Sequence, residues 1–160
     1  SFLLLAAREL HFTTVALPAL YLLYSAIAAI LSIPFGRLAD RCGRLPILLF
    51  SFLCWAGVAL LFTVATSALP LLLALALYGV HIGAYDPVKK AIVSELAPPA
   101  IVASVLGGYQ LIIGITSFSA SLIAGLLWDS FGLTMPFLVS LVLTLLASVV
   151  LLTIPLQRRT

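Results

Sequence analysis

The stretch of sequence that decides the fold is Gly36-Arg37-Leu38-Ala39-Asp40-Arg41-Cys42-Gly43-Arg44. It contains three arginines and separates two long runs without Asp, Glu, Lys or Arg, residues 12–36 and 45–85. An arginine at the centre of a membrane span costs about 2.5–3.5 kcal/mol, so three would cost roughly 7–10 kcal/mol. The stretch must therefore reach water. We expect Gly36 and Gly43 to bracket a tight turn between two antiparallel helices, because glycine tolerates left-handed backbone angles.

The composition is that of a membrane protein. Of the 160 residues, 64% are hydrophobic and only 8% are charged, whereas a soluble domain normally carries about 25% charged residues. A soluble core of this length could not bury so much apolar surface, so lipid must surround most of the chain. No stretch is rich enough in lysine and arginine to suggest nucleic-acid binding. Cys42 and Cys54 are too few for a disulfide framework.

Uncharged runs of sequence set the number of membrane spans. A bilayer core of about 30 Å requires roughly 20 apolar residues in a helix. Measured against this length, the sequence predicts transmembrane helices at residues 13–35, 46–66, 70–88, 100–127 and 133–154. Pro70 suits the first turn of a new helix, because an N–H there would have no helical partner. Backbone groups that face lipid must satisfy their own hydrogen bonds, and the runs are longer than barrel strands, so we expect helices.

The basic residues are distributed unevenly between the two ends of these helices. Seven of the eight lysines and arginines fall on one side, and Arg8 falls on the other. The seven are Arg37, Arg41, Arg44, Lys89, Lys90, Arg158 and Arg159. Because positively charged loops remain in the cytoplasm, we expect this side, together with the C-terminus, to be cytoplasmic.

Residues 34–44 closely resemble the cytoplasmic signature loop of the major facilitator superfamily, whose pattern runs Gly-x-Leu-Ala-Asp-Arg-x-Gly-Arg and then arginine or lysine. The positions that match in order are Gly36, Leu38, Asp40, Arg41, Gly43 and Arg44, with Arg37 at the variable position. Leu45 departs from the usual second basic residue, which removes one charge from the loop. An ordinary positively charged hairpin would explain the arginines, but neither the glycines nor Asp40.

The resemblance implies an all-α membrane protein that contains half of the twelve helices of that family. Three features favour the C-terminal half. The chain ends soon after the last span. The helix that begins near Ala100 lacks the Gly-Pro signature typical of first-half antiporter sequences. Residues 125–132 resemble the end of the eleventh helix of the family, and residues 86–98 resemble the loop after the tenth helix. We therefore expect residues 1–7 to be the end of a truncated seventh helix. Residues 8–160 are expected to form the five complete spans of a C-terminal half-bundle.

Three side chains with polar groups fall on one face of the helix predicted at 70–88, because Tyr78, His81 and Tyr85 stand at positions i, i+3 and i+7. In the family that the chain resembles, this tenth helix borders the central cavity. A titratable side chain inside a membrane suggests function, and His81 could bind substrate or take a coupling proton near physiological pH. A histidine that only hydrogen-bonds between two helices is the alternative. Gln110 is a further candidate for the cavity.

Small residues predict close packing of helices within the membrane. They form one stripe on the fourth span and a pair on the third. The stripe is Gly107, Gly114, Ser117, Ser121 and Gly125, and the pair is Gly79 and Gly83. We expect both sets to contact neighbouring helices.

Charged residues near the basic side are expected to form ion pairs. Asp86 can pair with Lys89 or Lys90 if the helix continues through them, and Asp86 or Glu95 is expected to meet an arginine of the signature loop. The resemblance implies that such charge pairs help to hold the outward-facing state, and that Asp40 approaches a helix of the opposite half. Plain surface charge is the alternative.

Together these features predict part of a secondary active transporter that moves a small solute across the bacterial inner (plasma) membrane by alternating access, with proton coupling as one option. The expected partners are membrane lipid, the solute, the N-terminal half of the same transporter and, for coupled transport, protons. No cofactor, metal or nucleic acid is expected. An enzyme is not expected, because neither Gly-x-Ser-x-Gly nor His-Glu-x-x-His occurs. The alternative is a self-standing small membrane scaffold or a subunit of an oligomeric exporter. The sequence leaves the solute, the mode of coupling and the oligomeric state open.

Overall fold

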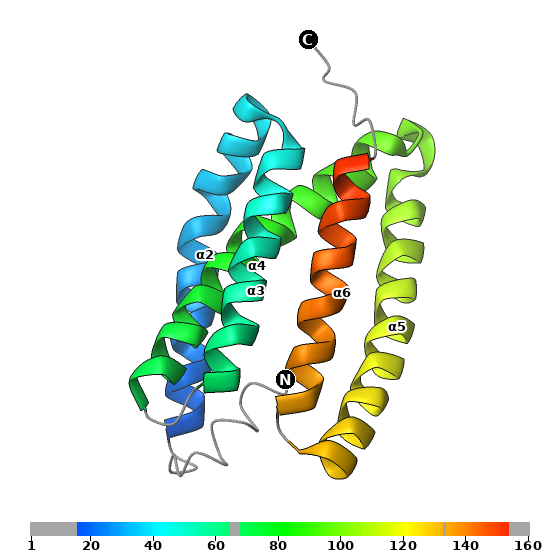
Figure 1. Ribbon diagram of the computed structural model, residues 1–160. Coiled ribbons are helices and arrows are strands. Elements are labelled where there is room, and N and C mark those ends of the chain that lie inside the picture. The colour runs from blue at the N-terminus through cyan, green and yellow to red at the C-terminus, as the bar shows by residue number, and fades with distance from the viewer. Residues whose placement is uncertain (1–15, 65–67, 133, 154–160) are drawn as a thin grey trace.

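The computed structural model describes residues 16–64, 68–132 and 134–153 (Figure 1). The helices in these ranges are α2 (Ala16–Cys42), α3 (Arg44–Val64), α4 (Ala68–Leu96), the short 3-10 helix η1 (Pro99–Ile101), α5 (Val102–Phe131) and α6 (Thr134–Thr153). The predicted truncated helix at residues 1–7, and the predicted start of the first span at residue 13, lie outside the described residues.

The five long helices are each long and apolar enough to cross a membrane. Successive helices run in alternating directions, as the colour gradient of Figure 1 shows. A helix satisfies its backbone hydrogen bonds within one segment, which is what an uncharged run of this length requires in lipid. The predicted class, an all-α protein with five membrane-spanning helices, is confirmed by this arrangement.

The connection between the first two helices is shorter than predicted. α2 continues to Cys42 and α3 begins at Arg44, so only Gly43 separates them. Gly43 has a φ of 89°, the left-handed region that favours glycine. Gly36 lies inside α2, so the prediction that it takes part in the turn was wrong. The physical reason is that charges mark where a helix leaves lipid, whereas the helix itself ends where the backbone must reverse.

The same reasoning corrects the end of the third span, which was predicted at residue 88. α4 continues through Pro87 to Leu96, so the expected loop after it begins only beyond that residue. Pro87 lacks an N–H, which leaves the carbonyl of Gly83 without its usual helical donor. The predicted limits at residues 66, 133 and 154 lie outside the described residues, and the other predicted limits agree with the helices to within a few residues.

α4 is the central helix of the bundle. It packs against α2 and against α3, while α6 packs against α3 and α5 lies along α6. In Figure 1, α4 passes behind α3 and rises toward the start of α5. The apolar core follows these contacts. Its larger cluster consists of Leu20, Val58, Ala59, Phe62, Leu71, Ala74, Leu75 and Phe137, and a second cluster consists of Ala39, Ile47, Leu48, Ala84 and Val88.

The glycine pair on α4 allows α2 and α4 to approach closely. A Cβ atom at Gly79 would lie 2.7 Å from the carbonyl oxygen of Tyr24, and one at Gly83 would lie 3.0 Å from that of Ala28. Any larger residue would therefore have to push the backbone of α2 away. The contact that the sequence predicted for this pair is present.

The small-residue stripe on α5 behaves differently. A Cβ atom at Gly107, Gly114 or Gly125 would meet nothing within 4 Å, and Ser117 and Ser121 are exposed. No residue of α5 is buried. Within the part of the chain that the structure describes, the predicted packing of this stripe is therefore not found, because α5 makes few contacts with the other helices.

Candidate functional site

Tyr78, His81 and Tyr85 form a stacked column along α4, which we call the α4 ladder. The ring of His81 lies 6.2 Å from that of Tyr78 and 5.5 Å from that of Tyr85, with interplanar angles of 22° and 14°. The spacing of three and four residues places the rings one above another on a single helix face. The structure thus brings together three of the four side chains predicted to border a cavity.

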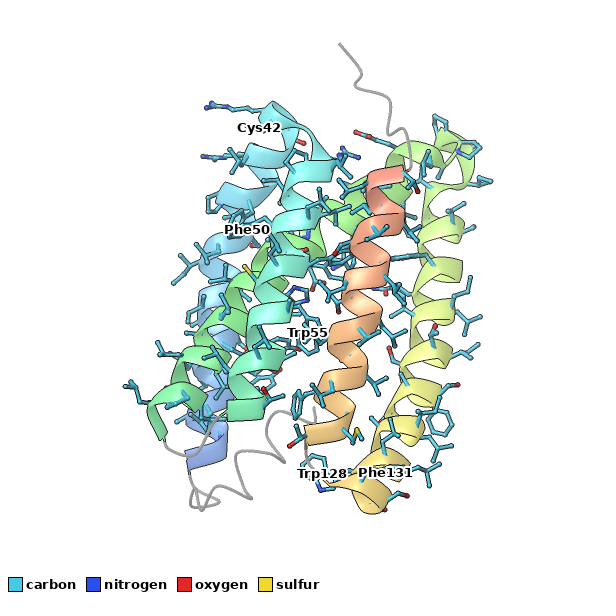
Figure 2. The ribbon with its side chains drawn as sticks, in the orientation of Figure 1. Cys42, Phe50, Trp55, Trp128 and Phe131 are labelled. Carbon is cyan, nitrogen blue, oxygen red and sulfur yellow. The ribbon has the colours of Figure 1, made fainter. Side chains whose placement is uncertain are left out.

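Aromatic residues of α3 cover the ladder. The ring of Trp55 lies 5.7 Å from Tyr78 and 5.5 Å from His81, and that of Phe52 lies 6.1 Å from Tyr85. Figure 2 shows Trp55 between α3 and α6, where its Nε1 donates a hydrogen bond to Ser140 Oγ over 2.8 Å. This bond fixes the indole against the ladder.

Sequence reasoning did not single out Trp55. The signal that could have identified it is chemical, because an indole N–H inside an apolar run requires an acceptor on another helix. The sequence does not reveal which helix supplies that acceptor.

His81 is the polar centre of the ladder. Only 9% of its surface is exposed, and its Nδ1 lies 2.7 Å from the carbonyl oxygen of Ser51 on α3. A carbonyl oxygen can only accept, so Nδ1 donates and, in the neutral ring, Nε2 is the acceptor. Nε2 forms no hydrogen bond with any other described residue. His81 therefore makes the predicted type of bond between helices, and it still has a free nitrogen.

Lys89 lies next to Tyr85, at the end of the ladder that is nearest to the basic end of the bundle. Its Nζ lies 4.5 Å from the centroid of the Tyr85 ring and 2.5 Å from Oδ1 of Asp86. The lysine side chain is 19% exposed and that of Asp86 is 40% exposed. The ammonium group is thus held by an ion pair and by a cation–π contact. This is the helical pairing of Asp86 that the sequence predicted.

Gln110, the fourth predicted cavity residue, is exposed on α5. Within the described residues it forms no hydrogen bond with the ladder. Its neighbour Tyr109 is half-buried. The predicted cavity role of Gln110 therefore has no support from a contact in the described part of the chain.

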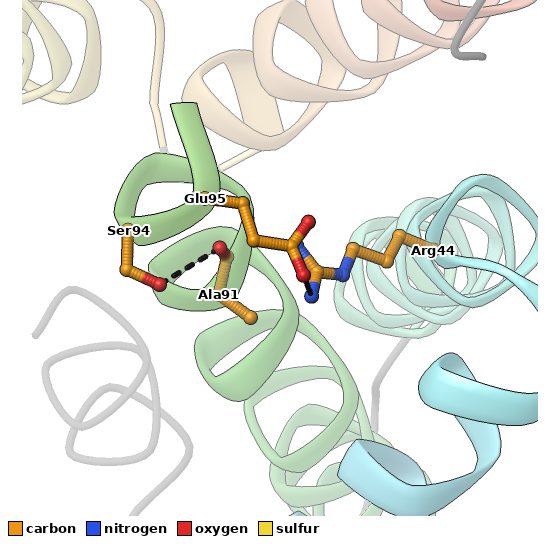
Figure 3. Close-up of polar contacts among 4 residues, drawn as sticks. All are labelled: Arg44, Ala91, Ser94 and Glu95. Carbon is orange, nitrogen blue, oxygen red and sulfur yellow. Dashed lines mark hydrogen bonds and ion pairs between the residues drawn. The ribbon is translucent and has the colours of Figure 1, made fainter. Parts of the chain in front are cut away.

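A second polar contact lies at the basic end of the bundle, where Arg44 forms an ion pair with Glu95 (Figure 3). Arg44 is the first residue of α3 and Glu95 is near the end of α4. A cation at a helix N-terminus opposes the helix dipole, and Glu95 offsets this. The Nη1 atom of Arg44 is buried and has no hydrogen-bond partner among the described residues.

The other charged residues of the signature loop lie on the last turns of α2. Arg37, Asp40 and Arg41 are exposed there, and none of them forms an ion pair or hydrogen bond with another residue in the described ranges. Lys90, on α4, is exposed as well. Among the charged residues of the loop, Arg44 is therefore the one that an ion pair joins to another described helix.

These observations define a multi-pass helical membrane protein with a column of aromatic and polar side chains on its central helix. The sequence profile of the Major Facilitator Superfamily matches residues 1–160, and the chain belongs to that superfamily. The resemblance seen in residues 34–44 is thereby confirmed. The assignment to the C-terminal half stays a prediction.

The chain is similar to an uncharacterised MFS-type transporter from Methanocaldococcus jannaschii. The two are 40% identical over 134 residues, which cover 84% of this chain and 33% of the relative. The chain thus spans about a third of the length of the curated relative that it matches. No solved structure matches it.

Proposed function

We propose that this chain is part of a secondary active transporter that moves a small solute by alternating access, with the basic end of the bundle in the cytoplasm. Membership of the superfamily, and a relative that carries the name of a transporter, support transport as the activity. Transporter sites of this kind lie near the middle of the bilayer, between two helical halves. In this chain, α4 would form one side of such a site.

The observation that carries the proposal is the position of His81. It lies within the span Leu69–Leu96, about 7.5 Å along the helix from Asp86, it is buried, and one of its two nitrogens forms no hydrogen bond with another described residue. Polar groups inside a span are costly, and they are retained mainly along solute or proton pathways. We assign His81 the role of substrate or proton contact, with Tyr78 and Tyr85 as its polar neighbours.

The ion pairs at the basic end, Arg44 with Glu95 and Lys89 with Asp86, are proposed to act as a cytoplasmic latch. Lys90, the fourth residue predicted for the latch besides Asp86, Lys89 and Glu95, forms no ion pair with another described residue. The contact between Arg44 and Glu95 supports this role because it joins the signature loop to the helix that carries the ladder. Asp40 is proposed to pair with the remainder of the transporter.

Replacing His81 with glutamine in the complete protein tests the site. A glutamine amide can still donate to the carbonyl of Ser51, but it cannot take up a proton. In liposomes, with a panel of sugars, amino acids and organic acids, we expect His81→Gln to reduce uptake at low solute concentration by about tenfold. The glutamine oxygen does not occupy the position of Nε2, so one buried hydrogen bond to the solute is lost. Under proton coupling, the response of uptake to a pH gradient should also disappear.

His11→Gln is the matched control, because it removes the only other imidazole of the chain. It should leave uptake and its pH response unchanged. If His81→Gln matches the wild type in both measurements, His81 has no role in transport. If the wild type moves no member of the panel under any imposed gradient, the transport proposal itself loses its support.

A further inference from the structure

One turn of α3 supplies two different contacts to the imidazole of His81. The carbonyl oxygen of Ser51 lies 2.7 Å from Nδ1, and the indole ring of Trp55 lies 5.5 Å from the imidazole ring. Ser51 and Trp55 stand four residues apart inside α3, so the same carbonyl also accepts the backbone N–H of Trp55. The position of the acceptor and the position of the indole are therefore coupled.

The stacking of His81 on its own helix does not select a tautomer. The rings of Tyr78 and Tyr85 fix the plane of the imidazole, with interplanar angles of 22° and 14°. A half turn of the ring about its Cβ–Cγ bond leaves this plane unchanged. Which ring nitrogen carries the proton therefore depends on which ring atom meets the carbonyl of Ser51.

Trp55 is itself held from a further helix. Its Nε1 donates a hydrogen bond to Ser140 Oγ on α6 over 2.8 Å, and its ring lies 5.7 Å from that of Tyr78. A buried indole N–H requires such an acceptor. The indole is thus fixed between α6 and α4 (Figure 2), on the same side of α3 as the carbonyl of Ser51.

We propose that Trp55 is a positioning residue for His81, and that Ser140 is the anchor that holds Trp55 in place. The indole keeps the imidazole against the carbonyl of Ser51, so that Nδ1 carries the proton and Nε2 remains the acceptor. All of these contacts join helices that the structure describes. The consequence for uptake rests on the role proposed above for His81, whereas the tautomer of the ring does not.

Nitrogen NMR of the complete protein in liposomes, with isotope-labelled histidine, measures the tautomer. The difference from the spectrum of His81→Gln assigns the two ring nitrogens. In mildly alkaline buffer, where imidazole is neutral, the wild type should show a protonated Nδ1 and an unprotonated Nε2. Ser140→Ala removes the anchor and leaves every ring in place, and it should give a mixture of both tautomers. Trp55→Phe should give the same mixture, and the double variant should change it no further.

Uptake by the same variants measures what the position of the ring contributes to transport. Each should raise the solute concentration for half-maximal uptake about fivefold, the equivalent of the roughly 1 kcal/mol of one neutral hydrogen bond. The maximal rate should stay unchanged, because only the fraction of molecules with a correctly placed ring binds the solute.

Two variants of α6 serve as controls. Ser148→Ala removes a hydroxyl that bonds only to the carbonyl of Thr144 within α6, and it should change neither the tautomer nor uptake. Ser140→Thr keeps an acceptor for the indole and should resemble the wild type in both measurements.

A single tautomer with a protonated Nδ1 in both Ser140→Ala and Trp55→Phe would overturn the proposal, whatever their uptake. So would a protonated Nε2 in the wild type, because the carbonyl of Ser51 would then not hold the ring. A mixture of tautomers with unchanged uptake would support the positioning by Trp55 and would remove His81 from transport instead. Ser140→Ala keeps the experiment decisive if Trp55→Phe does not fold.

Discussion

Single residues determine how closely the central helices approach each other. Gly79 has no space for a side chain, because a Cβ atom there would lie 2.7 Å from a backbone oxygen of α2 and 2.9 Å from the Cβ of Ile27. Backbone atoms cannot move aside as the end of a flexible side chain can. Gly36, in contrast, is a helical glycine whose Cβ would meet only Pro87, at the ordinary distance of 3.9 Å.

We therefore expect Gly79→Ala to destabilise the protein by about 1–3 kcal/mol, the usual cost of overpacking. Gly36→Ala is the control, and it should be neutral or stabilising by up to about 1 kcal/mol, because alanine favours a helix. Thermal unfolding in detergent measures both variants. Equal midpoints for the two variants would show that α2 and α4 do not approach at Gly79.

Between elements, polar pairs fix how the helices meet. Trp55 and Ser140 tie α3 to α6, Ser51 and His81 tie α3 to α4, and Arg44 and Glu95 join the two ends of α3 and α4 that lie on the basic side. The first two lie inside the bundle, where apolar contacts alone would allow helices to slide. The third lies at the water boundary, where it holds the short connection after α2 against α4.

Reversing the charges of Arg44 and Glu95 tests whether this ion pair contributes to stability. Arg44→Glu and Glu95→Arg should each lower the unfolding midpoint, because each places like charges together. The double variant should recover most of the loss. The expected coupling is about 0.2–1 kcal/mol, since 58% of the Glu95 side chain is exposed. Lys90→Glu serves as control and should show no coupling with Glu95→Arg. Additive losses in the double variant would contradict the pair.

At the scale of the whole molecule, the bundle has one strongly basic end. Arg37, Arg41, Arg44 and the lysines of α4 all lie at the end of the bundle where α2 finishes and α3 begins. Cys42 is exposed there and labelled in Figure 2, whereas Cys54 is buried. Ser130 lies at the opposite end, near the end of α5.

A membrane-impermeant maleimide can therefore report the orientation. In a Cys54→Ser background, Cys42 should react in inverted vesicles and be protected in right-side-out vesicles or cells, because the basic end is expected in the cytoplasm. With Cys42→Ser and Ser130→Cys, the pattern should reverse. Labelling of Cys42 from outside intact cells would invert the proposed topology.

Much of the fold could be predicted from the sequence. The number of spans, their approximate positions and the helical class depend on local hydrophobicity and length, which a single run of residues displays. The C-terminal ends of α2 and α4 could not be predicted from hydrophobicity, since both helices continue through charged residues into water. The α4 ladder followed from helical periodicity, whereas the exposure of Gln110 depends on how α5 is rotated against the other helices, which the sequence of α5 alone does not display.

The sequence by itself determined that this protein crosses the membrane as a helical bundle with one basic end, because lipid imposes these features on each segment separately. Only the tertiary structure decided which polar groups meet. The hydrogen bond of Trp55 joins residues 85 positions apart, and the ion pair of Arg44 joins residues 51 positions apart. Such partners depend on the rotation of one helix against another, which is set by packing at positions such as Gly79 and not by the hydrophobicity of either helix.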